Sequence, residues 1–339
     1  MDYRRLGRSG LMVSPICLGT AKFGDRVNEA TAGRLIAMAR EAGVNFIDTA
    51  DKYVLGRSET MVGKLIRRDR DRWVLATKVG LPWDERPNRS GLGRKWIMEQ
   101  LEASLRRLGT DYVDLYYLHR NDPDTPLEET VMAMGDIVGQ GKARYIGLSN
   151  LPGWRISQYV ALSEKFGLPR PIACQPYYNA LNRMAETEVM PACGHFGLGV
   201  VPFSPLSAGI LTGKYRPDTP PPPSSRAGAG DARMLQVDYR DESLRLTQVI
   251  KAHAEARGMT VVDFALNWVL NSRDVTSVIA GPRTAAQWRS YMGALKHPFS
   301  AEDEALVDGL VPSGHPSTPG YNDPQFPPTG RRPRTGLPG

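Results

Sequence analysis

Cysteines and long apolar runs are both scarce in this sequence, and each scarcity excludes a class of protein. The 339 residues include three cysteines, Cys17, Cys174 and Cys193, which form no CxxC motif and cannot all pair with one another. This usage favours buried thiols in a reducing compartment over a disulfide framework. No run approaches the roughly 18 apolar residues of a membrane span, and no apolar segment follows the basic N-terminus. We therefore expect a cytoplasmic protein without a membrane span.

Several short motifs of catalytic and binding sites are also absent. No G-x-G-x-x-G follows a predicted strand, because GLGR at 91–94 lacks the third glycine, and this argues against a Rossmann domain. No G-x-S-x-G motif of a hydrolase is present. The histidines show neither HExxH nor paired spacing, and Cys193-Gly194-His195 alone is more typical of a helix end. We therefore predict no metal site.

The charge distribution gives little support for a nucleic-acid partner. The net charge is +7, but the basic residues are dispersed and interleaved with acids. The densest basic cluster, Arg331, Arg332 and Arg334, lies in a tail rich in proline and glycine. Dispersed charge of this kind favours a local positive patch for a small anionic ligand over binding of nucleic acid.

Short β-rich runs alternate with amphipathic helical patterns along most of the chain. The predicted strands span 14–18, 44–48, 73–78, 112–118, 143–148, 171–175, 198–203 and 276–280. Most are apolar almost throughout, as parallel strands covered on both faces are. A helix is predicted over 94–108, with Ile97, Leu101 and Leu105 on one stripe and Gly109 at its end.

Eight strand–helix units favour an α/β fold of the (β/α)8 TIM-barrel type over an open doubly wound sheet. We expect one barrel domain over 1–311 that begins with a β-hairpin around Arg8-Ser9-Gly10. A Pro/Gly-rich tail is expected over 312–339. Long connecting loops, 216–232 above all, are expected at the C-terminal face of the barrel, where variable loops set substrate choice.

Residues suited to binding or chemistry follow every predicted strand. In chain order they are Gly19 and Thr20, Asp48, Lys78, His119, Ser149 and Asn150, Gln175, Phe203 and Ser204, and Gly281 with Arg283. Packing does not explain this, because no single strand needs a polar end for its own sake. In a barrel all these ends meet at one mouth, where active sites lie.

The strand ends also belong to longer motifs. In chain order and at plausible spacing, these are VNFIDTADKY, LATK, DYVDLYYLH, RYIGLSN, CQPYYN, PFSPLSAGILTGKY and VIAGPRTAAQ. Together, over roughly residues 3–310, the chain resembles the aldo-keto reductases, in particular bacterial long-chain members related to potassium-channel β-subunits. The resemblance implies a barrel that binds NADPH without a Rossmann domain. It also implies a catalytic tetrad of Asp48, Tyr53, Lys78 and His119.

The chemistry of carbonyl reduction suits these four residue types. Hydride addition places negative charge on the carbonyl oxygen, so the site needs a proton donor and a stabiliser of that charge. A lysine beside Tyr53 would bring the phenol pKa toward the working range, and Asp48 would hold Lys78 charged. His119 would orient the carbonyl. Taken alone, Lys78 and Tyr53 would be rim residues and His119 a structural histidine. We expect the neighbouring Asp51 and Lys52 only to shape the turn or face solvent.

The resemblance also implies which residues hold NADPH or NADP⁺. Ser149, Asn150 and Gln175 suit the carboxamide, and Phe203 offers a face for the nicotinamide ring. Ser204, Leu206 and Gly209 form a loop for the pyrophosphate. Gly281, Arg283 and Gln287 suit a 2′-phosphate and adenosine, which predicts NADP over NAD. Gly19, Thr20 and Asp48 complete the predicted cofactor residues. Tyr291 replaces a frequent family asparagine, and either stacks on adenine or simply packs.

The sequence predicts the type of reaction more specifically than it predicts the substrate. Val54 and Trp83 are candidate pocket residues for a small carbonyl substrate, although Trp83 could equally anchor its loop. The sequence permits oligomerisation. The main prediction is a reversible NADPH-dependent reduction of an aldehyde or ketone. The alternative is an NADPH-binding, redox-sensing regulatory subunit with little turnover, because the same family includes potassium-channel β-subunits.

Overall fold

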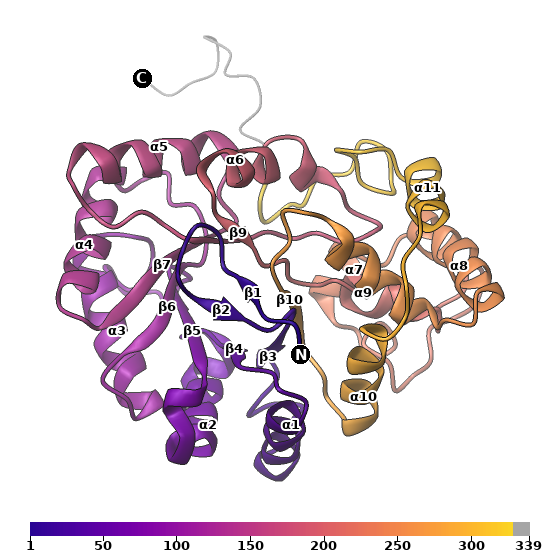
Figure 1. The fold of residues 1–339 in the computed structure, drawn as a ribbon, viewed down its shortest axis with the longest axis horizontal. Helices are drawn as coiled ribbons and strands as arrows, with labels where there is room; N and C mark the ends of the chain where they lie inside the picture. The colour runs from indigo at the N-terminus through magenta and orange to yellow at the C-terminus, as the bar shows by residue number, and fades with distance from the viewer. Residues whose placement is uncertain (328–339) are drawn as a thin grey trace.

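A single closed barrel forms the centre of the molecule. The computed structural model describes residues 1–327, so the basic cluster at 331–334 and the end of the predicted tail lie outside the described residues. The parallel strands are β3 (Ile16–Gly19), β4 (Phe46–Asp48), β5 (Val74–Val79), β6 (Val113–Leu118), β7 (Ala143–Ser149), β8 (Ala173–Gln175), β9 (Gly199–Val200) and β10 (Val278–Ala280). Each lies within a predicted range or extends it by one residue. The strands gather at the centre and the helices surround them (Figure 1).

The sheet order shows how the barrel closes. The eight strands are hydrogen-bonded in the order β10-β3-β4-β5-β6-β7-β8-β9. A parallel bridge between Val200 and Val275, and a bond from Ile279 N–H to the Pro202 carbonyl at 3.0 Å, join the two ends of this series. The predicted TIM-barrel fold is therefore confirmed. All eight strands point their carboxyl ends to one mouth.

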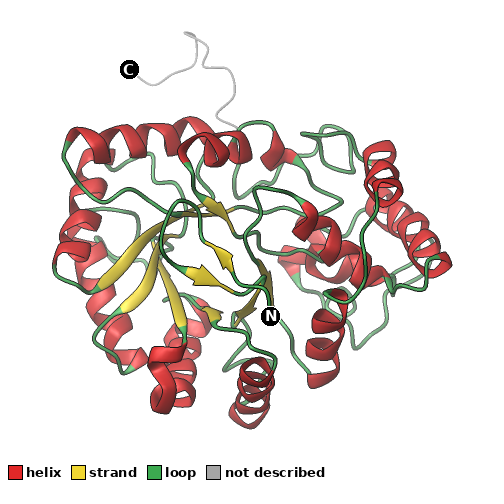
Figure 2. Cartoon of the chain, in the orientation of Figure 1, coloured by secondary structure: helices red, strands yellow, loops and turns green. Residues whose placement is uncertain are grey.

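Helices pack around the outside of this sheet (Figure 2). They are α1 (Glu29–Glu41), α2 (Arg57–Ile66), α3 (Arg94–Leu108), α4 (Leu127–Gly139), α5 (Gly153–Lys165), α6 (Val189–Phe196), α7 (Ala232–Val237), α8 (Asp241–Ala256), α9 (Val261–Asn271), α10 (Ala285–Ala294) and α11 (Ala301–Leu310). α3 matches its predicted bounds, because its apolar stripe is buried and Gly109 ends it in the left-handed conformation (φ 63°). None of the helices in the described part is long and apolar enough to cross a membrane.

The core has two layers. Inside the barrel, side chains such as Phe46, Leu115 and Tyr117 fill the space that the strands enclose. A larger apolar layer separates the strands from the helices. This arrangement explains why the strand sequences are apolar on both faces. Because the interior is filled, the mouth of the barrel is left to bind ligands.

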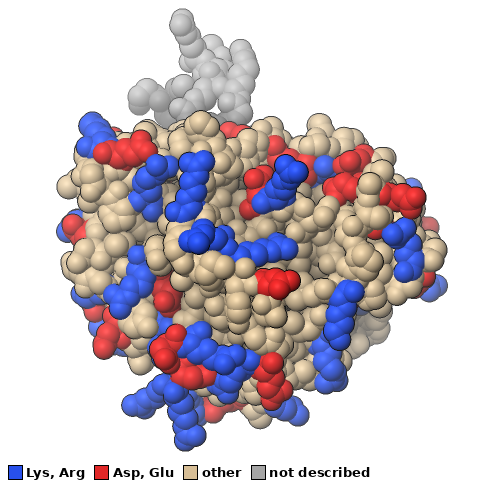
Figure 3. Space-filling model, viewed as in Figure 1, with Lys and Arg blue, Asp and Glu red and all other residues tan. Residues whose placement is uncertain are grey.

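A β-hairpin lies across the opposite end of the barrel from the mouth. β1 (Arg4–Arg5) pairs antiparallel with β2 (Met12–Val13), as the sequence predicted. Leu6 and Val13 of this hairpin are fully buried against the interior core. On the face that carries the hairpin, basic and acidic side chains are interspersed (Figure 3).

The start of the predicted tail is bound to the body of the protein. The Ser317 N–H donates to the Leu181 carbonyl at 2.8 Å, and the Arg183 N–H donates to the His315 carbonyl at 3.0 Å. Asp323 forms an ion pair with Arg233 of α7. We propose that 1–311 form one domain and that the described residues after it, 312–327, extend along its surface.

Candidate active site

Four predicted site residues meet at the mouth of the barrel. Asp48 ends β4 and Lys78 lies near the end of the adjacent β5, while His119 directly follows β6. Tyr53 begins a short 3-10 segment (Tyr53–Gly56) that follows β4. Adjacent parallel strands bring their ends together, so residues that are 30 or more positions apart in sequence become neighbours.

Lys78 is the centre of this group. Its fully buried ammonium donates to Asp48 Oδ2 at 2.6 Å, to the Thr49 carbonyl at 2.7 Å and to Tyr53 Oη at 3.2 Å. Three acceptors match the three donors of an ammonium group. Burial lowers the pKa of Lys78, but the attraction of Asp48 and Tyr53 outweighs burial, and the net pKa is raised. Lys78 is therefore charged at neutral pH.

Tyr53 is a neutral phenol in this setting. Burial raises its pKa above the ordinary value, while Lys78 acts in the opposite direction. Lys78 itself lowers the pKa as predicted, but burial prevails, so the expected net shift of the phenol pKa toward the working range is wrong. The error arose because the depth of the side chain is a property of the fold. A phenol that keeps its proton at pH 7 is suited to donate it.

His119 lies beside Tyr53, with the two rings edge to face and their centroids 5.8 Å apart. Burial, followed by the charges of Lys78 and Arg120, lowers the pKa of His119 well below its usual range. The imidazole is therefore neutral. Its Nδ1 is fully buried and has no hydrogen-bond partner among the described residues. Nε2 is thus the nitrogen that can meet a substrate.

Hydrogen bonds connect this group to the ends of the next strands. Gln175 at the end of β8 donates from Nε2 to Asp48 Oδ1 at 3.0 Å. Ser149 at the end of β7 donates to the Gln175 carbonyl at 2.9 Å, and Asn150 Nδ2 donates to the His119 carbonyl at 2.9 Å. The predicted carboxamide residues therefore form one network with the predicted catalytic residues.

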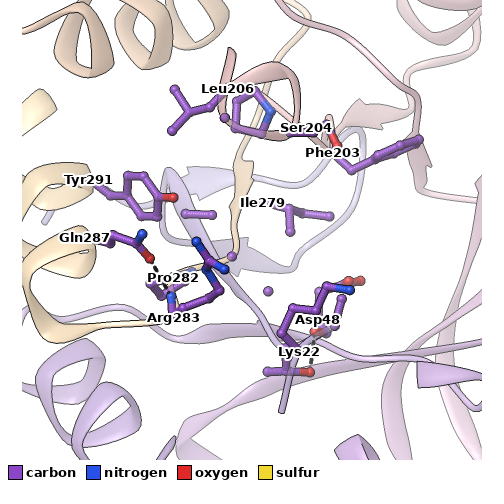
Figure 4. A pocket seen from close by; sticks show the side chains of 18 of the residues that line it. Lys22, Asp48, Phe203, Ser204, Leu206, Ile279, Pro282, Arg283, Gln287 and Tyr291 are labelled. Atoms are coloured by element: carbon purple, nitrogen blue, oxygen red, sulfur yellow. Dashed lines mark hydrogen bonds between the residues drawn. The ribbon is translucent and has the colours of Figure 1, made fainter. Parts of the chain in front are cut away.

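All the predicted cofactor residues line a cavity of about 300 Å³ at the mouth. The predicted residues in the lining are Gly19, Thr20, Asp48, Tyr53, His119, Ser149, Asn150, Gln175, Phe203, Ser204, Leu206, Gly209, Gly281, Arg283 and Gln287. Phe203, Ser204 and Leu206 lie along one side and the start of α10 along another, with Asp48 and Lys22 on a third side (Figure 4). The cavity thus runs from the tetrad toward the N-terminus of α10.

The segment after β10 is arranged to bind an anion. Thr284 caps α10 by accepting from the Gln287 N–H at 3.2 Å, and Gln287 Oε1 accepts from the Arg283 N–H at 2.7 Å (Figure 4). A guanidinium beside a helix N-terminus presents positive charge to the cavity. Tyr291 also lines the cavity, one turn further along α10. Burial raises the pKa of this phenol to about 12, so it offers a neutral ring.

Four cationic residues of the cavity were not predicted from the sequence. Lys22 and Arg26 come from the loop after β3, and Lys214 and Arg226 come from the long loop after β9. Lys214 does lie in the motif LTGKY, but nothing in the pattern separates it from a solvated lysine. With Arg283, these residues place five cations around one cavity. These cations form a local positive patch of the kind that the sequence predicted for a small anionic ligand.

The two candidate substrate residues are placed differently. Neither Val54 nor Trp83 is among the described residues that line the cavity. Trp83 is held by the guanidinium of Arg107, 5.1 Å from its ring, and its carbonyl accepts from Lys52 Nζ at 3.0 Å. Trp83 therefore anchors its loop. Val54 is half-buried in the left-handed conformation (φ 50°), at the edge of the site beside Tyr53.

Asp51 is buried rather than solvent-exposed, which corrects one of the two readings given for it. Its carboxylate accepts from the Lys52 N–H at 2.6 Å and from Gln100 Nε2 of α3 at 2.9 Å. Burial is the main reason that its pKa rises to about 7. The bond to its own neighbour shows that Asp51 shapes the turn that carries Tyr53.

Comparisons with known proteins agree with this geometry. The profile of the aldo/keto reductase family matches residues 15–312. A probable voltage-gated potassium channel subunit beta of Arabidopsis thaliana is 37% identical over 302 residues, which cover 87% of this chain and 91% of that protein. The L-glyceraldehyde 3-phosphate reductase of Escherichia coli O157:H7 is 33% identical over 324 residues, covering 93% of each chain. The uncharacterized oxidoreductase YrpG of Bacillus subtilis is 35% identical over 331 residues, covering 94% of this chain and 98% of that protein.

The family profile spans most of the chain, and the relatives are matched over nearly their whole length. The barrel with its ligand cavity at the carboxyl ends of the strands is the architecture that the resemblance implied. The chain therefore belongs to the aldo/keto reductase family and is an oxidoreductase.

Proposed function

We propose that the protein uses NADPH to reduce an aldehyde or ketone to an alcohol, in a reversible reaction. The observation that supports this most is the buried ammonium of Lys78, which bonds to Asp48 and Tyr53 at the inner end of the cavity. A phenol bonded to a charged lysine, beside a neutral imidazole, is a proton-donating group aimed at a developing alkoxide.

Each residue has a distinct role in the proposed reaction. Tyr53 donates its proton to the carbonyl oxygen, and Lys78 stabilises the phenolate that results. Asp48 keeps Lys78 charged and in place, since an unpaired buried lysine tends to lose its proton. His119 donates from Nε2 to the substrate oxygen and orients the carbonyl. The oxygen thus meets two donors at the moment when negative charge develops on it.

The cofactor residues fit NADPH from one end of the cavity to the other. When bound, NADPH supplies the hydride that reduces the carbonyl carbon. Ser149, Asn150 and Gln175 would hold the carboxamide, and Phe203 would cover the ring. The loop from Ser204 to Gly209 and the nearby cations would hold the pyrophosphate. Arg283 at the start of α10 would hold the 2′-phosphate.

Arg283→Ala should raise the Kd for NADPH by about 10- to 100-fold and change the Kd for NADH by less than about threefold. The reason is that a charge-assisted bond to a phosphate is lost only with NADPH. The two values are measured by fluorescence titration of each cofactor. Arg289→Ala, at an exposed position of the same helix outside the cavity, is the matched control. Equal affinity for both cofactors in the wild type, unchanged in Arg283→Ala, contradicts the NADP assignment.

A second candidate function is a regulatory subunit that binds NADPH with little turnover. The Arabidopsis relative is described as a probable potassium channel subunit, which favours a cofactor-binding regulatory role for this chain as the second candidate. Loss of NADPH absorbance over a panel of aldehydes and ketones separates the two. Rapid oxidation of NADPH supports the enzyme, whereas tight cofactor binding with negligible turnover over the whole panel supports the regulatory subunit.

The substrate panel follows from the chemistry of the site. The name of the Escherichia coli relative gives glyceraldehyde 3-phosphate as one compound to include. Uncharged aldehydes of similar size should be compared with it, because five cations surround the cavity and NADPH will use some of them. We also propose a cytoplasmic location, supported by the three cysteines, all of which are free and buried.

A further inference from the structure

The turn after β9 has an unusual backbone conformation. Ser204 (φ 55°), Ser207 (φ 46°) and Ala208 (φ 50°) all lie in the left-handed region, within five consecutive residues. Residues other than glycine pay a steric penalty there and persist in it only when their surroundings hold them. Ser204, Ala208 and the adjacent Gly209 line the cavity. The surroundings of this turn therefore decide the shape of one part of the binding site.

A buried carboxylate holds the turn from behind. Asp238, which directly follows α7, is 5% exposed, and its Oδ1 accepts from Ser207 Oγ at 2.8 Å and from Tyr177 Oη at 2.5 Å. Asp238 forms no ion pair with any described residue, although Arg226 and Arg240 act on it from a distance. A buried, unpaired carboxylate is costly unless its hydrogen bonds are satisfied, so both of these bonds matter to the fold.

The second partner of Asp238 belongs to another part of the cavity. Tyr177 follows β8 closely, and its ring packs against Phe203, with the centroids 5.5 Å apart. The Phe203 N–H donates to the Pro176 carbonyl at 3.0 Å. Oδ1 of Asp238 therefore binds both Ser207 of the left-handed turn and Tyr177, whose ring packs against Phe203.

None of the three connected residues touches the cavity. Asp238, Tyr177 and Ser207 are all missing from the described residues that line it, whereas their neighbours Phe203, Ser204 and Ala208 are present. An effect of Asp238 on ligand binding must therefore act through the shape of the turn and the position of the ring.

We propose that Asp238 is a positioning residue that holds the Ser204–Gly209 turn and the Phe203 ring in their cofactor-binding shape before the cofactor arrives. The inference rests on the proposed function, because the cavity is taken to bind NADPH. Without Asp238, the turn relaxes from its left-handed conformations, and NADPH must restore them when it binds. That restoration weakens binding but does not alter the tetrad.

Asp238→Ala should raise the Kd for NADPH at least about tenfold, with kcat at saturating NADPH within about twofold of wild type. Asp238→Asn keeps the Oδ1 acceptor and should recover most of the affinity. Gln236→Ala, at an exposed position of α7, is the matched control. Kd is measured by fluorescence titration on the full chain, kcat by NADPH absorbance, and folding by thermal unfolding without cofactor. A general loss of structure would lower kcat as well as affinity.

Two further variants keep the inference testable if Asp238→Ala does not fold. Ser207→Ala and Tyr177→Phe each remove one bond to Asp238 and should each raise the Kd for NADPH about threefold or more. Wild-type affinity in the folded Asp238→Ala protein, or in both single-bond variants, overturns the inference. Failure of the wild-type protein to bind NADPH is a different result, because it overturns the proposed function itself.

Discussion

Tyr53→Phe should lower kcat by about 10²- to 10⁴-fold, the range expected when a general acid is removed. The Kd for NADPH should stay within about twofold, because the phenol oxygen meets the substrate rather than the cofactor. The Lys78–Asp48 pair does not depend on Tyr53, since Lys78 keeps two other acceptors at 2.6 and 2.7 Å. Turnover is measured by NADPH absorbance at saturating carbonyl substrate, and binding by fluorescence titration.

Tyr159→Phe is the matched control for this variant. Tyr159, in α5, is fully buried and its hydroxyl has no partner among the described residues. Removing that hydroxyl should leave kcat unchanged. Wild-type kcat in Tyr53→Phe contradicts the assignment of Tyr53 as proton donor. An equal loss of kcat in Tyr159→Phe means that the loss in Tyr53→Phe reflects impaired folding rather than a missing proton donor.

Lys78→Met should lower both stability and turnover. The change leaves the Asp48 carboxylate buried without a cation, and losing one partner of a buried pair costs about 3–5 kcal/mol of unfolding free energy. Tyr53 also loses the ammonium that stabilises its phenolate, so kcat should fall by about 10²-fold or more. Urea unfolding measures the first effect, and NADPH oxidation measures the second.

A double variant separates the two effects. Asp48→Asn combined with Lys78→Met removes both charges, and should recover at least about half of the lost stability because no uncompensated charge remains. Its kcat should stay as low as that of Lys78→Met. A double variant less stable than Lys78→Met contradicts the account of Lys78 and Asp48 as a mutually compensating buried pair.

The fold was predictable because its signals are local. The strand Ile16–Gly19 is buried at every position, and its uninterrupted apolar sequence, ICLG, records that directly. The end of α3 was predictable because Gly109 adopts a left-handed conformation that few other residues accept. The order of polar residues at the strand ends predicted the site, since a barrel brings these ends together.

Other features depend on contacts between distant segments. The upward shift of the Tyr53 pKa results from burial of its side chain, and the buried Asp51 carboxylate accepts a hydrogen bond from Gln100, 49 positions away in sequence. Trp83 faces Arg107 rather than the cavity for the same kind of reason. Lys22 and Arg226 line the cavity because of loop geometry. No periodic pattern in the sequence encodes such contacts.

The most direct test of the central claim follows the hydride itself. NADPH that carries deuterium at both C4 positions of the nicotinamide is mixed with excess protein and a small aldehyde, and the alcohol is analysed by mass spectrometry. We predict one deuterium on the carbinol carbon for each NADPH consumed, and at least about 100-fold less of this product with Tyr53→Phe within the time of the first wild-type turnover. Tightly bound NADPH that yields no deuterated alcohol from any aldehyde or ketone tested would contradict the assignment as a carbonyl reductase.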